Sequence, residues 1–118
     1  MPDTGYATQS YEAESRSLLS DVRRFVAAAS EPYLEQPSVH DLVLAVTEAC
    51  ANAIRHSGTA EVRVTVHVDG RCVEIVVEGD AGSHRGMYLM AAMVDDFSLH
   101  RGTDASAGTT VRLLKCAS

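Results

Sequence analysis

Several features are scarce or missing in this 118-residue chain, and each scarcity excludes a class of protein. There is no tryptophan, and the chain has only three prolines. The longest uninterrupted apolar run, Met87–Val94, is far shorter than the roughly 20 residues that span a bilayer. The N-terminus shows no leader with a charged and an apolar part. We therefore expect a soluble, cytoplasmic protein with no membrane partner.

Basic residues are also few. Ten basic against 16 acidic residues give a net charge of −6, and lysine occurs only at position 115. A protein that coats a phosphate backbone needs a localised basic patch, so we expect no direct nucleic-acid partner. A hydrophobic fraction of 46% with 22% charged residues is typical of a globular domain. We expect residues 1–118 to form one domain, with residues 1–6 and 102–108 as its loose segments.

Cysteine is the third scarce residue. Cys50, Cys72 and Cys116 are odd in number and widely spaced, and no Cys-x-x-Cys pair indicates a redox or zinc site. This pattern favours a reducing compartment. Cys50 and Cys72 fall on core-facing positions, so we expect both to be small buried hydrophobes.

Hydrophobic periodicity predicts an α+β chain. Apolar residues recur at spacings of three and four in 14–29 and 38–56, which predicts two amphipathic helices. Ser38 and Asp41 form a capping-box-like start for the second helix. Valines then alternate with polar residues over 62–68, and Asp69-Gly70 predicts a hairpin turn into a returning strand at 72–77. The remaining expected elements are strands at 6–12, 97–101 and 109–114 and a helix at 86–95. We expect helices on one face of a mostly antiparallel, mixed sheet.

The second predicted helix carries a polar stripe. Between positions 42 and 54 only Thr47, Glu48 and Asn52 are polar. At helical spacing Glu48, Asn52 and His56 share one face. Such a stripe faces internal partners or a wet cavity, where a carboxamide oxygen can bind Mg²⁺ and a carboxylate can take a proton. Alternatively, it is the solvent-facing side of a half-exposed helix.

These residues also carry a resemblance to a known family. The run Leu44–Gly58, with its pattern Glu-x-x-x-Asn-Ala-x-x-His, resembles the N-box of the histidine-kinase-like ATPases (the Bergerat or GHKL fold) in the form of bacterial anti-sigma-factor serine kinases. Arg85–Met90 resembles the glycine box, and Val94-Asp95 resembles the Val-Asp that follows it. Gly108–Val111 resembles the last box, Gly-Thr-x-Val. The resemblance covers essentially the whole chain and implies a Bergerat two-layer sandwich with about three helices.

The resemblance implies an ATP and Mg²⁺ site. Glu48 would be the catalytic base toward a serine hydroxyl, and Asn52 would coordinate the Mg²⁺ on the triphosphate. The other implied nucleotide-binding residues are Arg55, His56, Asp80, Gly82, Arg85, Gly86 and Thr109. Gly86 suits phosphate independently, because free N–H groups at a helix start attract anions. Thr109 would support adenine recognition through an ordered water. Arg85 would reach the terminal phosphate, or it is a solvated turn residue.

The adenine box departs from the family pattern Asp-x-Gly-x-Gly, whose Asp accepts the exocyclic amine of adenine. In one register Asp80 and Gly82 supply the Asp-x-Gly, and His84 replaces the second glycine. In the ungapped register Gly79 stands at the Asp position, and the adenine contact is lost.

The lid of the family is missing as well. Relatives carry a long flexible segment that folds over the triphosphate, but only three residues separate Gly82 from Gly86. Three residues span at most about 10 Å and cannot form a lid. Its loss should impair catalysis more than recognition of the nucleotide's shape, because a lid excludes water and fixes the phosphates.

The resemblance implies a transcription regulator of the anti-sigma-factor type. It would bind a sigma factor and an anti-anti-sigma partner of the STAS type alternately, with serine phosphorylation of the latter as the switch, and it could form a homodimer. The alternative is a lid-less pseudo-ATPase that acts purely as a protein-binding module. A third hypothesis is a freestanding ATPase domain of the sensor-kinase type, against which stands our expectation that no phospho-accepting histidine helix precedes it.

Overall fold

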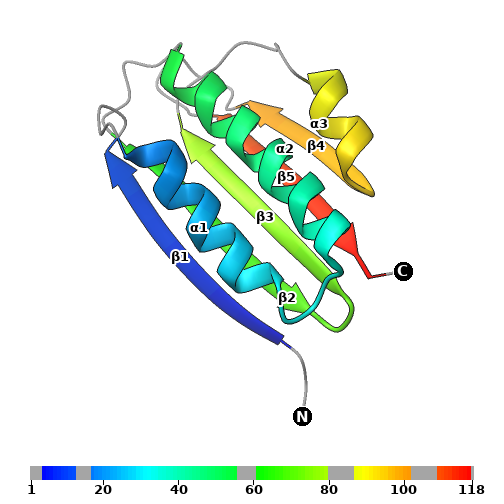
Figure 1. The fold of residues 1–118 in the computed structure, drawn as a ribbon. Coiled ribbons are helices and arrows are strands. Elements are labelled where there is room, and N and C mark those ends of the chain that lie inside the picture. The colour runs from blue at the N-terminus through cyan, green and yellow to red at the C-terminus, as the bar shows by residue number, and fades with distance from the viewer. Residues whose placement is uncertain (1–3, 13–16, 56–60, 80–86, 102–108, 118) are drawn as a thin grey trace.

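The computed structural model describes residues 4–12, 17–55, 61–79, 87–101 and 109–117, which build a sheet and three helices in two layers (Figure 1). The strands are β1 (Thr4–Glu12), β2 (Glu61–Asp69), β3 (Cys72–Gly79), β4 (Asp96–Arg101) and β5 (Thr109–Cys116). The helices are α1 (Leu18–Ser30), α2 (Gln36–Arg55) and α3 (Met87–Met93). The strand order is β1-β2-β3-β5-β4. The described strand pairs are all antiparallel, which confirms the predicted α+β architecture without the parallel pair that a mixed sheet would contain.

The helices cover one face of the sheet, and the core lies between the two layers (Figure 1). Val62, Val64 and Val66 of β2 point into this core and are almost fully buried, as the alternation predicts. The hairpin turn also lies where Asp69-Gly70 predicts it. Gly70 has φ of +63°, the first central position of a two-residue turn, where a side chain would be strained.

Helix α2 begins earlier than predicted. Its first residue is Gln36, and the N–H of Val39 already donates to the Glu35 carbonyl at 3.0 Å. Ser38 therefore lies inside the first turn and is buried, so the predicted capping box of Ser38 and Asp41 is wrong. The physical reason is Pro37, since proline is tolerated in the first helical turn, where its missing N–H has no partner to lose.

The other face of the sheet has no helix over it in the described part of the chain (Figure 1). Most of the side chains that alternate onto this face are polar. Arg112 of β5 forms an ion pair with Glu74 of β3 there. At the edge, the ring of Tyr6 stacks on His67 at a centroid distance of 4.1 Å. Strand β1 begins at Thr4, within the segment expected to be loose. No helix in the described ranges is long and apolar enough to cross a membrane.

Candidate functional site

The polar stripe of α2 lies beside a fully packed face of the same helix. That packed face consists of Leu42, Ala45, Val46, Ala49 and Cys50, all buried. Thr47 is satisfied within the helix, because its hydroxyl donates to the Val43 carbonyl at 2.7 Å. Glu48 is half-buried, and its carboxylate forms no hydrogen bond or ion pair within the described part of the chain. A half-buried acceptor of this kind remains available to a ligand or a partner.

Two more predicted site residues lie further along α2. Asn52 and Arg55 follow Glu48 by one and two helical turns, and the helix continues to Arg55 as the motif requires. The described structure gives their backbone position only. His56 lies outside the described residues.

The end of β3 and the start of β5 lie side by side. Gly79, the last residue of β3, pairs directly with Thr109, the first residue of β5. Thr109 is buried, and its hydroxyl has no hydrogen-bond partner among the described residues, a state shared only by Ser30 at the end of α1. A buried hydroxyl left unpaired costs about 1–3 kcal/mol. Such a group suits a site where a ligand or its water completes the hydrogen bond.

The segments predicted to hold adenine and phosphate lie between β3 and α3 in the sequence. Asp80 and Gly82 follow β3 directly, and Arg85 and Gly86 precede α3; all four lie outside the described residues. Helix α3 begins at Met87, immediately after Gly86, as the glycine-box resemblance predicts. The C-terminal end of α2, the end of β3 and the start of β5 gather at one end of the sheet (Figure 1).

Sequence reasoning missed the residue that fixes α3. The Nζ of Lys115 on β5 donates to the Met93 carbonyl at 3.1 Å and lies 3.7 Å from a carboxylate oxygen of Asp41 on α2. One side chain thus joins the last strand, the end of α3 and the first turns of α2. The only signal in the sequence was that Lys115 is the sole lysine in a chain that otherwise uses arginine.

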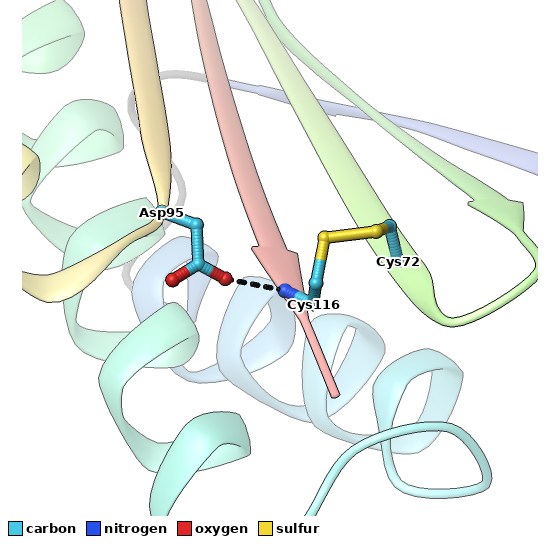
Figure 2. The surroundings of a disulfide bond; sticks show 3 residues. All are labelled: Cys72, Asp95 and Cys116. Carbon is cyan, nitrogen blue, oxygen red and sulfur yellow. Dashed lines mark hydrogen bonds between the residues drawn. A yellow bond between two sulfur atoms is a disulfide. The ribbon is translucent and has the colours of Figure 1, made fainter. Parts of the chain in front are cut away.

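The cysteines behave differently from the prediction. Cys72 and Cys116 form a disulfide between β3 and β5 (Figure 2). Cys72 alternates with the buried residues Val73 and Ile75, so it lies on the uncovered face and is only half-buried; its prediction as a core residue is wrong. The argument for a reducing compartment from unpaired cysteines fails with it. Cys50 is buried as predicted, and burial raises the pKa of its thiol to about 12.

The fold and the site define a class of protein. It is a two-layer α+β domain whose second helix carries a polar stripe and ends where β3 ends and β5 begins. Residues 11–85 match the family described as "Histidine kinase-like ATPase domain". Because this match covers more than half of the chain, the protein belongs to the histidine kinase-like ATPase domain family.

A solved structure has a similar fold. It is "The crystal structure of the RsbU and RsbW domains of Rv1364c from Mycobacterium tuberculosis", with a TM-score of 0.80 and 19% sequence identity. The similarity covers 95% of this chain and 32% of that chain. The protein therefore spans about a third of the length of the solved chain. At this identity the likeness shows the fold alone. No curated protein matches the sequence.

Proposed function

We propose that this protein is an anti-sigma-factor-type regulator of transcription that binds ATP and phosphorylates an anti-anti-sigma partner on serine. The observation that carries the nucleotide part is the buried hydroxyl of Thr109 beside Gly79, which has no hydrogen-bond partner among the described residues. Membership of the ATPase family supports the same assignment.

The available groups fit a magnesium nucleotide. The Thr109 hydroxyl can donate to or accept from an adenine-bound water, and the carboxamide oxygen of Asn52 is a ligand type that Mg²⁺ prefers. Asp80 and Gly82 follow β3 in the sequence, and Gly86 precedes α3. These residues would hold the base and phosphates, together with Arg55, His56 and Arg85. When bound, ATP supplies the phosphoryl group that is transferred.

Glu48 would act as the general base. Its carboxylate has no partner within the described part of the chain, so it can accept the proton of a serine hydroxyl as that oxygen attacks phosphorus. Leu44, one helical turn before it, is 39% exposed, an uncommon state for a large apolar residue on this helix. We propose that Leu44 contacts the protein substrate next to the reacting serine.

The partners we propose are a sigma factor and a STAS-type anti-anti-sigma protein, which it would meet in the cytoplasm. The fold shared with a chain that includes an RsbW domain supports this choice. The net charge of −6 supports a protein partner over direct contact with DNA.

The test is to incubate the protein with Mg-ATP and a candidate STAS partner and to look for phosphoserine by mass spectrometry. We expect one phosphate on each STAS partner. The phosphorylated partner, which competes with the sigma factor, should then dissociate from the complex. If no phosphate is transferred while the complex with sigma factor forms normally, the kinase part of the proposal is wrong.

The second candidate is the pseudo-ATPase, favoured by the short stretch between Gly82 and Gly86. Thermal unfolding with and without Mg-ATP separates the two. A ligand at 100 times its Kd adds about 2.7 kcal/mol, a shift of several degrees. An unfolding midpoint that does not change at millimolar ATP would favour the pseudo-ATPase that acts as a protein-binding module.

We also propose that the protein forms a homodimer through β1. Among the described strands β1 lies at the edge of the sheet and pairs with β2 alone, and residues 5–10 are exposed. An unpaired edge readily accepts a strand from a second copy. Sedimentation should give twice the monomer mass for the wild type, and Ala7→Lys on this edge strand should shift the mass toward the monomer. A monomeric wild type at high concentration would exclude the dimer.

A further inference from the structure

The disulfide lies on the face of the sheet that no described helix covers, and both of its cysteines are partly exposed. Cys72 and Cys116 are direct partners in the register of β3 and β5, and both are half-buried on the face that no described helix covers. Attack by a thiolate needs access to a sulfur, which this face allows.

Cys116 is also hydrogen-bonded to Asp95, in the short connection between α3 and β4. Its backbone N–H donates to a carboxylate oxygen of Asp95 at 2.7 Å (Figure 2). The N–H of Asp95 in turn donates to the Leu114 carbonyl at 2.8 Å. Lys115, between these two β5 residues, donates to the carbonyl of Met93, the last residue of α3. Three consecutive residues of β5 therefore hold the last residue of α3 and Asp95 in the short connection that follows it.

The same end of β5 is tied to the β2–β3 hairpin. The Ala117 N–H donates to the Arg71 carbonyl at 2.7 Å, next to the disulfide partner Cys72. The disulfide is thus the covalent link between the hairpin and the strand end that carries α3. Without it, the last residues of β5 are held by hydrogen bonds and the Lys115 contact, which fray more readily at a strand end.

The third cysteine, Cys50, is an internal control for the reactivity of the other two thiols. Cys50 is fully buried in α2, and its thiol stays protonated near neutral pH because burial raises its pKa. It should not react while the protein is folded.

We propose that Cys72 and Cys116 are a reversible thiol–disulfide site that fastens α3 to the sheet when oxidised and releases it when reduced. In reduction, a glutathione thiolate attacks one sulfur, forms a mixed disulfide and expels the other cysteine as a thiolate, which takes up a proton. A second glutathione resolves the mixed disulfide, so two electrons and two protons arrive and glutathione disulfide leaves. Oxidation by glutathione disulfide reverses these steps.

The consequence for the nucleotide rests on the proposed function. Helix α3 follows Gly86, the residue expected at the phosphates, so loosening α3 should weaken ATP binding. The loosening itself needs no nucleotide, and it can be measured separately.

The experiment exposes the full chain to glutathione buffers of graded ratio and measures native alkylation by iodoacetamide and amide hydrogen exchange. We expect Cys72 and Cys116 to become labelled together as the ratio of reduced glutathione rises, and Cys50 to stay unlabelled. Exchange in residues 87–95 and at the end of β5 should become about tenfold faster or more on reduction, while α1 keeps its protection. ATP affinity, measured on the same samples, should fall on reduction.

The controls are two variants. Cys72→Ser/Cys116→Ser should exchange like the reduced wild type and ignore glutathione, and Cys50→Ala should respond like the wild type. Cysteines that stay free in excess glutathione disulfide, a disulfide that resists glutathione in the folded protein, or unchanged exchange at α3 would each overturn the proposal. If α3 loosens but ATP never binds, the switch stands and the proposed function falls.

Discussion

The two ends of the central sheet are built in opposite ways. At one end Cys72 is bonded to Cys116, the Lys115 amino group is shared by α2 and α3, and Asp95 binds the backbone of β5. Seven residues along β3, about 23 Å away, Gly79 pairs with Thr109, whose hydroxyl has no partner in the described ranges. The first end is held by these covalent and polar links, and we call it the fastened end; the second carries the Thr109 hydroxyl without a partner in the described ranges, and we call it the open end. The difference separates the scaffold from the proposed site.

The largest effect should come from the open end. Glu48→Gln keeps the shape of the side chain but removes the base, so phosphoryl transfer to the STAS partner should fall by about 10²- to 10⁴-fold. The rate of phosphoserine formation under single-turnover conditions measures this. Glu61→Gln, an exposed carboxylate at the start of β2, is the matched control and should leave the rate unchanged. Transfer at the wild-type rate by Glu48→Gln would remove Glu48 from the mechanism.

The fastened end should dominate stability. The disulfide closes a loop with a sequence separation of 44, and the chain-entropy treatment of such a loop gives about 4 kcal/mol. Cys72→Ser/Cys116→Ser should therefore unfold at a midpoint lower by on the order of 10 °C than the oxidised wild type. The comparison is made by calorimetry, with reduced wild type as the second reference. Equal midpoints for the oxidised wild type and the double variant would show that the bond does not constrain the chain.

Replacing Lys115, at the fastened end of the sheet, should lower the stability by less than loss of the disulfide does. Lys115→Met keeps the aliphatic stem and loses the bond to Met93 and the ion pair with Asp41, so we expect about 1–2 kcal/mol less stability. Its side chain is only 16% exposed, which reduces solvent screening, although Asp41 is 41% exposed. The matched control is Arg24→Met, which removes an exposed pair with Asp21 and should cost less than about 0.5 kcal/mol. Urea unfolding of both variants should rank them in this order, and the reverse ranking would contradict the assignment of Lys115.

Much of the fold could be predicted from local pattern. The alternating valines of β2 and the Asp69-Gly70 turn determine a hairpin without reference to the rest of the chain, and the structure confirms both. The start of α2 could not be predicted in the same way, because Pro37 is acceptable both before a helix and in its first turn. The position of Cys116 opposite Cys72 depends on how strands 44 residues apart pair, which spacing along the sequence does not encode.

The chemistry of the site was predictable in part. Helical spacing places Glu48 and Asn52 on one stripe, and the described structure leaves the Glu48 carboxylate without a partner. The unpaired state of the Thr109 hydroxyl was not predictable, since it depends on which side chains pack around the start of β5. The roles of Asp80, Arg85 and Gly86 stay predictions.

The most direct test of the open end is the Kd of Mg-ATP for the wild type, Thr109→Val and Thr110→Val, measured by calorimetry alongside the unfolding midpoint of each. Thr109→Val removes a buried hydroxyl that no described residue satisfies, so its unfolding midpoint should hold or rise while its affinity for ATP falls about tenfold, or about 1.4 kcal/mol. Thr110→Val changes the neighbouring, half-buried threonine on the other face and should keep the wild-type Kd. An unchanged Kd for Thr109→Val, or a wild type that does not bind ATP, would contradict the assignment of this end of the sheet as a nucleotide site.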